Sequence, residues 1–433
     1  MASSMTERPI GFRPWEISAM VNVEVVTQHA EDAAFLWVLR DRAIRAPHYY
    51  LKDLVRLDER VEANVDGVRV AGSSGWDLAA KAMAQELPGE IFAAAVLAFE
   101  SKTAARIDAV LKASMVDPTL ARPVISALGW MRLEDAKPSL ESLIGAEKAE
   151  LRTIAIGGYA AHRVDPGEPL RRAVSDFNPA VQSCAFKAAG ELGRTDLAYT
   201  IVRSISAKEE SCRFYAAWSA ARLGLRDRDV LDTLRAIAES GTSYSEPAMQ
   251  MALRCMRFDE ARAWLSAMLK HPKSLRLGVI GSGAIGDPGL VGELIGYMQL
   301  EQVSRIAGEA FATITGIDLK YSDLDRPKPE SFEAGPNDDP ADPNVAMDAD
   351  EDLRWPSPAL VRKWWDKHEH EYQPGVRYLR RAPIETVGLT DALLRGYQRQ
   401  RAAAALELGL LHPSQPMFEV RAPGRRQAKL LAM

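Results

Sequence analysis

Three glycines in the second half of the chain have the spacing of a dinucleotide-binding site. Gly281, Gly283 and Gly286 form a GxGxxG pattern after the apolar segment LRLGVI. In such sites the glycines permit a tight turn and a close approach of the pyrophosphate, and an acidic residue about 20 positions later binds the ribose. Glu301 has roughly that spacing. However, Gly286 also falls on a 31-residue sequence period, and no series of alternating strands and helices follows. We therefore predict a junction between repeats and no cofactor.

His368 and His370, in the segment KHEHEY, are the best candidates for metal ligands. Residues two apart point to different faces of a helix, and helical metal-binding pairs lie four apart as in HExxH, a motif that this chain lacks. We predict a solvated, charged helix end at this position and no metal site.

Patterns typical of nucleophilic or phosphate chemistry are also missing. The chain has no GxSxG segment, and GSSGWD lacks the Lys and the Ser or Thr that end a phosphate-binding loop. Each of the three cysteines, Cys184, Cys212 and Cys255, falls within a predicted helix, where a small buried thiol fits well. The sequence therefore contains no assembled catalytic constellation, and we predict that the protein is not an enzyme.

The elements that position these residues follow a period of 31 to 32 residues. Similar text recurs at each step (SALGWM, GYAAHR, GELGRT, AARLGL, ALRCMR, GAIGDP), and the period runs through Gly129, Ala161, Gly193, Gly224, Cys255 and Gly286. A fixed period of this length with helical content is typical of stacked repeats. Ala98 lies one step earlier, so we expect the array to begin there.

Each repeat is predicted to be a helix, a short turn and a second helix. Proline often begins the first helix, where its missing amide proton costs nothing, as at Pro118, Pro179, Pro247 and Pro272. An aspartate follows the small residue that ends the first helix, and we interpret these aspartates as caps of the second helix rather than catalytic acids: Asp135, Asp165, Asp196, Asp227, Asp259 and Asp287.

The chain divides into four predicted regions. Residues 1–90 form an N-terminal helical cap, 91–320 the repeat array, 321–352 an acidic, proline-rich linker, and 353–433 a C-terminal helical module. The linker has too few large apolar side chains to offset the entropy of ordering, and its charge would suit a basic surface of the C-terminal module.

Details within the two flanking regions are also predicted. In the N-terminal cap we expect two helices, a loop at residues 72–75 (GSSG) and a third helix from Trp76 to Ala84, with Pro88 beginning the next. In the C-terminal module, LTDALLRGYQRQRAAAALELGLL is predicted to be one long helical run.

Composition narrows the functional classes. The formal net charge is -5, so the whole chain has no general attraction to nucleic acid or to an anionic membrane surface. No segment approaches 18 uncharged apolar residues, and the N-terminus MASSMTERPIGFRPW lacks the apolar stretch of an export signal. Three widely spaced cysteines argue for a reducing compartment. We therefore expect a cytoplasmic protein.

Four arginines recur at equivalent positions of the predicted second helices. This arginine row consists of Arg171, Arg172, Arg203 and Arg235. If the second helices line the concave face of the array, the arginine row could bind an acidic segment of a protein partner through bidentate contacts. The acidic linker of the same chain is an equally suitable ligand, and a solvated basic face is the simpler alternative.

The C-terminal module is rich in aromatic residues, among them Trp355, Trp364, Trp365, Tyr372 and Tyr378. Such a group either anchors the module on the last repeats or forms an exposed binding patch. We favour anchoring, because a module of this size needs a surface on which to bury its apolar side chains. Trp364 and Trp365 are the candidates for partner contacts under the second alternative.

The repeats resemble HEAT repeats, and in particular the HEAT-like repeats of the phycobilisome-lyase type. GWMRLEDAKPSLESLI and GAIGDPGLVGELIGYM match the helix end, turn, aspartate and second helix of that family over about 200 residues. The resemblance implies an all-α, HEAT-like α-solenoid of about seven two-helix repeats. It is specific for the fold and says little about function.

A second resemblance covers nearly the whole chain. VEANVDGVRVAGSSGW, EAFATITGIDL, WPSPALVRKWW, RYLRRAPI and RQRAAAALELGLLHPSQPMFEVRAPGRRQ are similar to a bacterial family of uncharacterised HEAT-repeat proteins, some of which are encoded near type VI secretion spike and effector genes. The repeat architecture and the missing catalytic constellation predict a non-enzymatic scaffold that binds a protein. The second resemblance implies that this partner is a secreted effector or a secretion component, and that the chain is an adaptor, chaperone or immunity-like protein. A lyase acting on a bilin and a self-associating rod are the alternatives.

Overall fold

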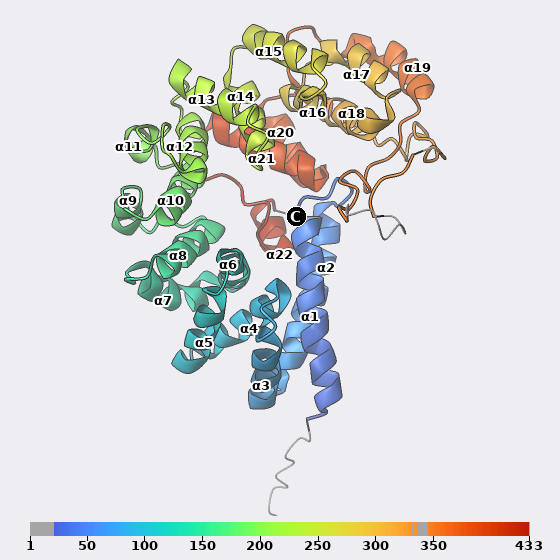
Figure 1. Cartoon of the computed structure of the whole chain (residues 1–433). Coiled ribbons are helices and arrows are strands. Elements are labelled where there is room, and N and C mark those ends of the chain that lie inside the picture. The colour runs from blue at the N-terminus through green and yellow to red at the C-terminus, as the bar shows by residue number, and fades with distance from the viewer. Residues whose placement is uncertain (1–20, 331, 337–344, 433) are drawn as a thin grey trace, which may run out of the picture.

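The fold is all-α, as predicted. The computed structural model describes residues 21–330, 332–336 and 345–432, so the N-terminal segment and part of the acidic linker for which we made predictions lie outside the described residues. Helices account for 68% of the structure and strands for 1%. Figure 1 shows the helices stacked in a curved array, with α20 (Thr386–Arg395), α21 (Gln398–Leu411) and α22 (Gly424–Leu430) inside the curve.

The N-terminal region consists of α1 (Val23–Ala43), α2 (Leu51–Val70) and α3 (Gly72–Met83). The loop predicted at residues 72–75 is wrong, because these residues form the first turn of α3. A Cβ atom on Gly75 would lie 2.1 Å from the carbonyl oxygen of Val68. The glycine therefore allows α3 to begin directly against the end of α2, and it does not interrupt the helix.

Seven helix pairs follow. Their first helices are α4 (Pro88–Ser101), α6 (Ala121–Trp130), α8 (Ala149–His162), α10 (Pro179–Leu192), α12 (Glu210–Arg222), α14 (Ser245–Cys255) and α16 (Leu275–Ile285). Their second helices are α5 (Ala104–Ser114), α7 (Leu133–Ile144), α9 (Glu168–Ala173), α11 (Ala198–Val202), α13 (Arg228–Ala238), α15 (Phe258–Lys270) and α17 (Val291–Tyr297). Each first helix packs against the first helix of the next pair, and α18 (Glu301–Thr315) continues this series.

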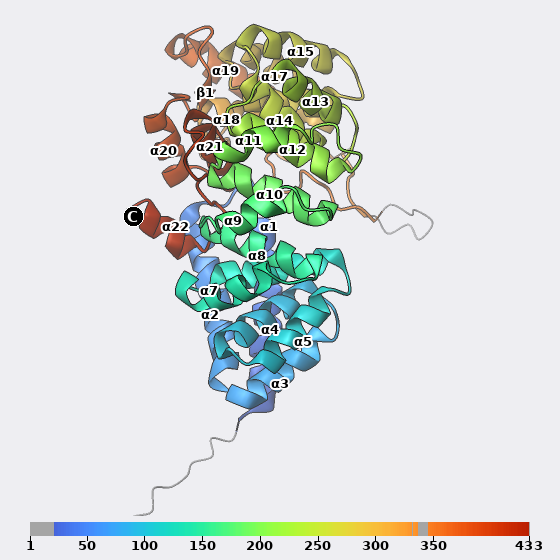
Figure 2. The same cartoon turned by 90° about the vertical axis from the view of Figure 1, so that its left-hand side faces the viewer.

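Short 3-10 turns join some of these helices: η1 (Pro118–Leu120), η2 (Thr195–Leu197) and η3 (Pro288–Leu290) precede α6, α11 and α17. In Figure 2, which is turned by 90°, the pairs lie one above another from α3 at the bottom to α15 at the top. The hydrophobic core accordingly lies between the first and second helices along the array.

The periodic small residues end the first helices, as predicted. Gly286 follows α16 with a φ of 70°, a left-handed conformation that favours glycine. Among the aspartates after these ends, Asp287 accepts a hydrogen bond from the amide of Gly289 and Asp165 from that of Gly167. Asp227 is the residue before α13, but its side chain makes no such bond.

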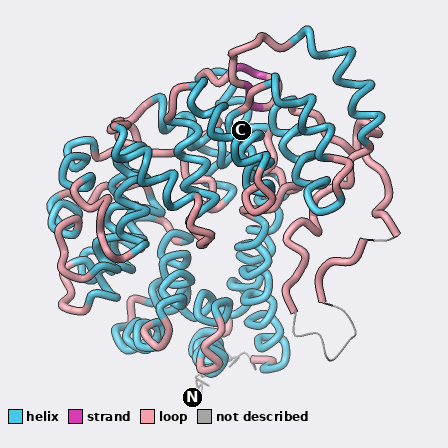
Figure 3. The backbone as a smooth tube through the Cα atoms, turned by 45° about the horizontal axis from the view of Figure 1, so that its top comes forward, coloured by secondary structure: helices cyan, strands magenta, loops and turns pink. Residues whose placement is uncertain are grey.

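The C-terminal region contains α19 (Pro358–His368), η4 (Glu369–Glu371), a two-stranded antiparallel sheet of β1 (Tyr378–Leu379) and β2 (Ala382–Pro383), α20 (Thr386–Arg395), α21 (Gln398–Leu411) and α22 (Gly424–Leu430). Figure 3 shows the two short strands in magenta among the helices. The single long helix predicted over residues 389–411 is wrong: the chain turns at Gly396, so α20 and α21 pack against each other.

The C-terminal region packs on both the last and the first helices of the chain. α19 packs beside α17, α21 lies inside the curve of the array, and residues 412–423 lead back to α22, which packs on α2 (Figure 1). We call residues 412–423 the tail segment. It connects the last repeats with the N-terminal hairpin of α1 and α2.

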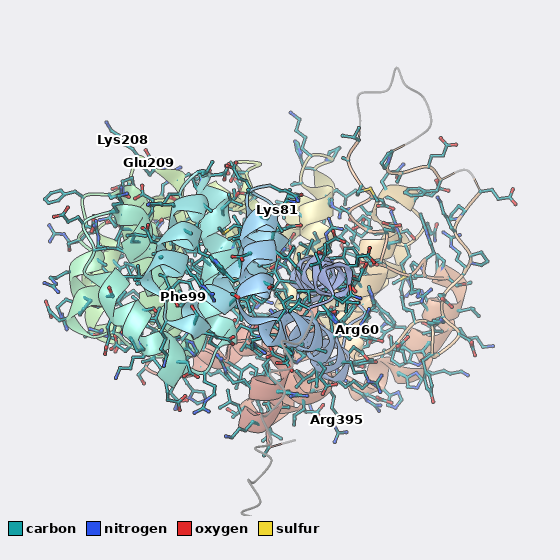
Figure 4. The ribbon with its side chains drawn as sticks, turned by 90° about the horizontal axis from the view of Figure 1, so that it is seen from below. Arg60, Lys81, Phe99, Lys208, Glu209 and Arg395 are labelled. Atoms are coloured by element: carbon teal, nitrogen blue, oxygen red, sulfur yellow. The ribbon has the colours of Figure 1, made fainter. Side chains whose placement is uncertain are left out.

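The described helices include none that is long and apolar enough to cross a membrane. Figure 4, a view from below, contrasts a core residue with surface residues. Phe99 of α4 is 1% exposed, whereas the labelled charged residues are exposed: Arg60, Lys81, Lys208, Glu209 and Arg395.

Candidate functional site on the inner face

The inner face of the array is formed by the first helices. Two adjoining cavities of about 600 Å³ and about 370 Å³ lie between these helices, the end of α1 and the C-terminal region. First helices from α6 to α18 supply the lining residues of the array, and none of the lining residues comes from α5, α7, α9, α11, α13, α15 or α17. The second helices therefore form the outer face.

The arginine row lies on this outer face. Arg171 and Arg172 are in α9, Arg203 follows α11, and Arg235 is in α13. The expectation that second helices line the concave face is thus wrong for this chain. Both layers bury one side against the other, so the sequence pattern alone does not tell which layer faces inward. Partner binding by the arginine row stays a prediction.

Neighbouring carboxylates already occupy part of the arginine row. Arg171 lies 2.5 Å from Asp196 of the next pair, and Arg235 lies 3.6 Å from Asp232 in its own helix. The Arg235 guanidinium also lies 5.4 Å from the centre of the Trp264 ring. These contacts fit the solvated basic face that we considered as the simpler alternative.

Trp364 and Trp365 anchor α19 on the array. The Trp364 ring packs edge-on against Phe311 of α18, with 5.5 Å between ring centres. Trp365 is 6% exposed and contacts Tyr372. Of the two alternatives for the aromatic group, the structure shows anchoring at both tryptophans.

Arginines of the first helices bind acidic residues that follow the array in sequence. We call three of them, Arg254, Arg276 and Arg305, the inner arginines. Arg276 donates two hydrogen bonds to Asp350, at 2.7 and 2.6 Å, and Arg305 donates two to Asp348, at 2.7 and 2.9 Å. The acidic linker therefore does bind a basic surface of the array, but on the first helices and not at the arginine row.

The Arg305 contact includes aromatic rings. Its guanidinium lies 4.9 Å from the centre of the Trp355 ring and 5.0 Å from that of Phe332, and its side chain is 6% exposed. The Arg305 charge lowers the pKa of Asp348 through their hydrogen bonds. Charge pairing and ring stacking together hold the linker against α18.

Arg254 binds the C-terminal helix α21. Its Nε lies 3.1 Å from Glu407, which also lies 2.5 Å from Arg377, and the side chains of Arg254 and Glu407 are 3% and 5% exposed. One signal could have indicated this face from the sequence. Arg222 and Arg254 lie 32 residues apart, one repeat step, near the ends of two first helices.

The tail segment binds the ends of the first helices in the middle of the array. Arg222 is fully buried and donates to the carbonyl oxygens of Pro413 and Gln415, at 3.1 and 2.6 Å. Burial lowers the pKa of the Arg222 guanidinium to about 10. Arg163 donates to the carbonyl oxygen of Met417 at 2.7 Å. An extended segment thus follows the inner face across several repeats.

Nearer to both ends of the array, the C-terminal region likewise donates hydrogen bonds to carbonyl groups at the ends of first helices. The amide of Tyr378 donates to the carbonyl oxygen of Gly286 at 2.7 Å, and Arg426 donates to that of Gly129 at 2.7 Å. Carbonyl groups at a helix C-terminus have no partner within the helix and carry partial negative charge. The C-terminal region therefore satisfies the very ends that the sequence period marks.

The smaller cavity collects positive charge. It lies between α6, α8, α10, the end of α1 and tail residues 419–423, and its lining includes Arg122, Lys187 and Arg421 beside Glu191 and Glu419. The two cavities share Glu191, Glu419 and Arg421. Charged side chains of both signs therefore line the wall that the two cavities have in common.

The glycines and cysteines considered for cofactor binding and catalysis are packed against neighbouring helices or have their pKa raised by burial. Gly281 and Gly283 lie within α16, where Cβ atoms would meet Leu265 and Ala310 of neighbouring helices. Burial raises the pKa of Cys184 and of Cys255 to about 11, so neither thiol is ionised near neutrality. The third thiol, Cys212, has its pKa raised by burial as well.

The two histidines are not arranged as metal ligands. His368 ends α19, its Nδ1 lies 2.7 Å from the carbonyl oxygen of Trp364, and its ring stacks on that tryptophan. Within residues 21–330, 332–336 and 345–432, no group of three or more His, Cys, Asp or Glu side chains is placed to hold a metal ion.

Comparison with known proteins adds no assignment. Neither a protein-family model nor a curated protein matches this sequence.

Proposed function

We propose that the protein is a HEAT-like α-solenoid that binds proteins and catalyses no reaction, and that its inner face binds an acidic, extended segment of a partner. The observation that carries this proposal is the binding of the linker to two of the inner arginines, Arg276 and Arg305. Asp348 and Asp350 each receive two hydrogen bonds from an arginine of a first helix. A surface that holds such a segment within the chain has the chemistry to hold one from another protein.

The linker would then be an internal competitor for the partner. Asp348 and Asp350 bind Arg305 and Arg276, whereas Leu324 of the same linker packs in the core. Arg276 keeps 46% of its side chain exposed. A partner segment with spaced carboxylates and an aromatic residue would displace the part of the linker around Asp348 and Asp350 without unfolding the array. The resemblance to proteins encoded near type VI secretion genes makes a secreted effector or a secretion component the first partner class to test.

A peptide of residues 345–356, added to the full-length protein, tests the binding surface. Wild-type protein should bind it weakly, because the linker occupies the surface. The variant Asp348→Asn, Asp350→Asn should bind it at least about tenfold more tightly, which is about 1.4 kcal/mol. Fluorescence anisotropy with labelled peptide measures both affinities.

Matched variants distinguish the two faces. We call the variant Asp348→Asn, Asp350→Asn the vacated variant. Adding Arg276→Gln and Arg305→Gln to it should abolish peptide binding, whereas adding Arg171→Gln and Arg203→Gln should leave peptide binding unchanged. The inner face would be refuted as the binding surface if only the Arg171→Gln and Arg203→Gln changes abolished binding, or if the vacated variant did not bind the peptide. Capture from a native lysate, with the vacated variant compared with the inner-arginine variant, then identifies the partner.

A further inference from the structure

The smaller cavity contains a lysine whose charge is not balanced. Lys187 lies in α10 and lines the cavity of about 370 Å³. Within the part of the chain that the structure describes, its ammonium group forms no hydrogen bond or ion pair, and it lies 5.7 Å from the centre of the Tyr215 ring. A cation removed from bulk water ordinarily has a carboxylate partner, and here the available carboxylates bind elsewhere.

Those carboxylates are Glu191 and Glu419. Glu191 lies 2.9 Å from Arg163 and 3.1 Å from Arg421. Glu419 likewise lies 2.9 Å from Arg163 and 2.9 Å from Arg421. Each of the two carboxylates thus pairs with both guanidinium groups, so these four charges neutralise one another. Lys187 is left as an additional positive charge beside this group.

The electrostatic surroundings of Lys187 agree with this count. The positive charge of Arg421 lowers the pKa of Lys187, burial lowers it further, and the more weakly acting Glu191 does not compensate. Arg421 itself uses Nε and Nη2 for its contacts with Glu191 and Glu419. No hydrogen bond from its Nη1 to any described residue is present, so that group is a second donor at the cavity wall.

Arg122 of α6 supplies a third cationic group. One of its amino groups pairs with Asp41, which also pairs with Arg45. Burial lowers the pKa of Arg122, Asp41 opposes this effect, and the charges of Arg45 and Arg421 lower the pKa further. Solvent reaches this wall, because the side chains of Arg122 and Arg421 are 51% and 44% exposed.

We propose that this cavity binds a small organic dianion, with Lys187, Arg122 and Arg421 around its oxyanion. The rest of the wall includes apolar side chains, among them Ile125 of α6 and Ala188 of α10, which suit a carbon skeleton attached to the charged group. A phosphate monoester and a dicarboxylate both have this chemistry. The site is separate from the linker surface, since Arg276 and Arg305 do not line this cavity.

Isothermal titration calorimetry with three probes tests the site: phenyl phosphate, succinate and inorganic phosphate. We expect wild-type protein to bind phenyl phosphate or succinate, whichever the site prefers, at least threefold more tightly than inorganic phosphate, because only the organic probes contact the apolar wall. Lys187→Met should weaken the preferred probe at least tenfold, and Arg122→Gln should weaken it severalfold. Lys208→Met, which removes an exposed lysine of the outer rim, should have no effect.

Thermal melting separates lost binding from lost folding. Without a probe, Lys187→Met should melt at the same temperature as the wild type or higher, because it removes repulsion from Arg421. With the preferred probe at one fixed concentration, the wild type and Lys208→Met should gain more melting temperature than Lys187→Met and Arg122→Gln. Failure of wild-type protein to bind any probe, equal binding by Lys187→Met, or a lower melting temperature of the free Lys187→Met protein would each overturn the proposal.

Discussion

The inner and outer faces each contain a carboxylate that lies between two arginines, and the two differ mainly in burial. On the inner face, Glu407 lies 3.1 Å from Arg254 and 2.5 Å from Arg377, and its side chain is 5% exposed. Arg254 and Glu407 are both buried and have no water as an alternative partner, so each depends on the other.

On the outer face, Asp196 lies 2.5 Å from Arg171 and 2.7 Å from Arg194, and its side chain is 44% exposed. Hydrogen bonds from Arg194 lower the pKa of Asp196 to about 2. Water and salt still reach this group, so its pairing contributes little to stability. Similar geometry thus has different consequences on the two faces, and the arginines that matter for the fold are those facing inward.

Exchange of each carboxylate for its amide should give the largest contrast. We expect Glu407→Gln to lower the free energy of unfolding by about 3–5 kcal/mol, because Arg254 would remain buried without a counter-charge. Asp196→Asn should lower it by less than about 1 kcal/mol. Urea unfolding followed by circular dichroism measures both. Equal losses in the two variants would contradict the distinction between the faces.

Substitution of two glycines with left-handed backbone should give a smaller contrast in stability. Gly286 and Gly241 have φ values of 70° and 74°, but a Cβ on Gly286 would lie 2.3 Å from the carbonyl oxygen of Tyr378, whereas none of the surrounding atoms comes within 4 Å at Gly241. Gly241→Ala should cost about 1–2 kcal/mol through backbone strain alone. Gly286→Ala should cost more, because it also displaces Tyr378.

Limited proteolysis and thermal melting check this pair. Gly286→Ala should increase cleavage near residues 378–383, and Gly241→Ala should not. If the two variants lose the same stability and are cleaved alike, the contact of the C-terminal region with the helix ends contributes nothing measurable to the fold.

The smallest predicted effect concerns the dependence of stability on pH, which should be slight at moderate pH. Burial alone would raise the pKa of Glu191 and Glu419, but Arg163 and Arg421 outweigh it and lower both pKa values. Their folded-state pKa values therefore lie below the unfolded value of about 4.3. The stability that they contribute is fully present above that value and is lost as the pH falls below it.

Unfolding free energies at pH 6 and at several values below pH 4.5 test this prediction. Glu419→Gln should flatten the decline, and about 0.5 M salt should leave the inner contribution largely intact because the side chains of Glu191 and Glu419 are only 8% and 6% exposed. An unchanged pH dependence in Glu419→Gln would show that the inner carboxylates do not control acid stability.

Much of the array could be predicted from local signals. The period located the ends of the first helices, Pro88 marked the start of α4, and the glycines at residues 281–286 were correctly interpreted as a repeat junction. Each of these features depends on residues close in sequence, so a single chain reveals them.

The site could not be predicted in the same way, because its partners are distant in sequence. Arg276 and Asp350 lie 74 residues apart, and Arg222 and Pro413 lie 191 apart. No local pattern records such pairs. Which layer of helices faces inward also depends on the curvature of the whole array, and no local signal predicts it. The expectation that the arginine row lies on the concave side fails for this reason.

The position of the tail segment in the chain has a consequence for biosynthesis. Pro413 is translated 191 residues after its partner Arg222. At about 5–20 residues per second, the inner face would stand uncovered on the ribosome for roughly 10–40 s after Arg222 emerges. A molecule that binds there during this interval would be enclosed when the tail segment arrives, whereas one that arrives later would meet a closed array.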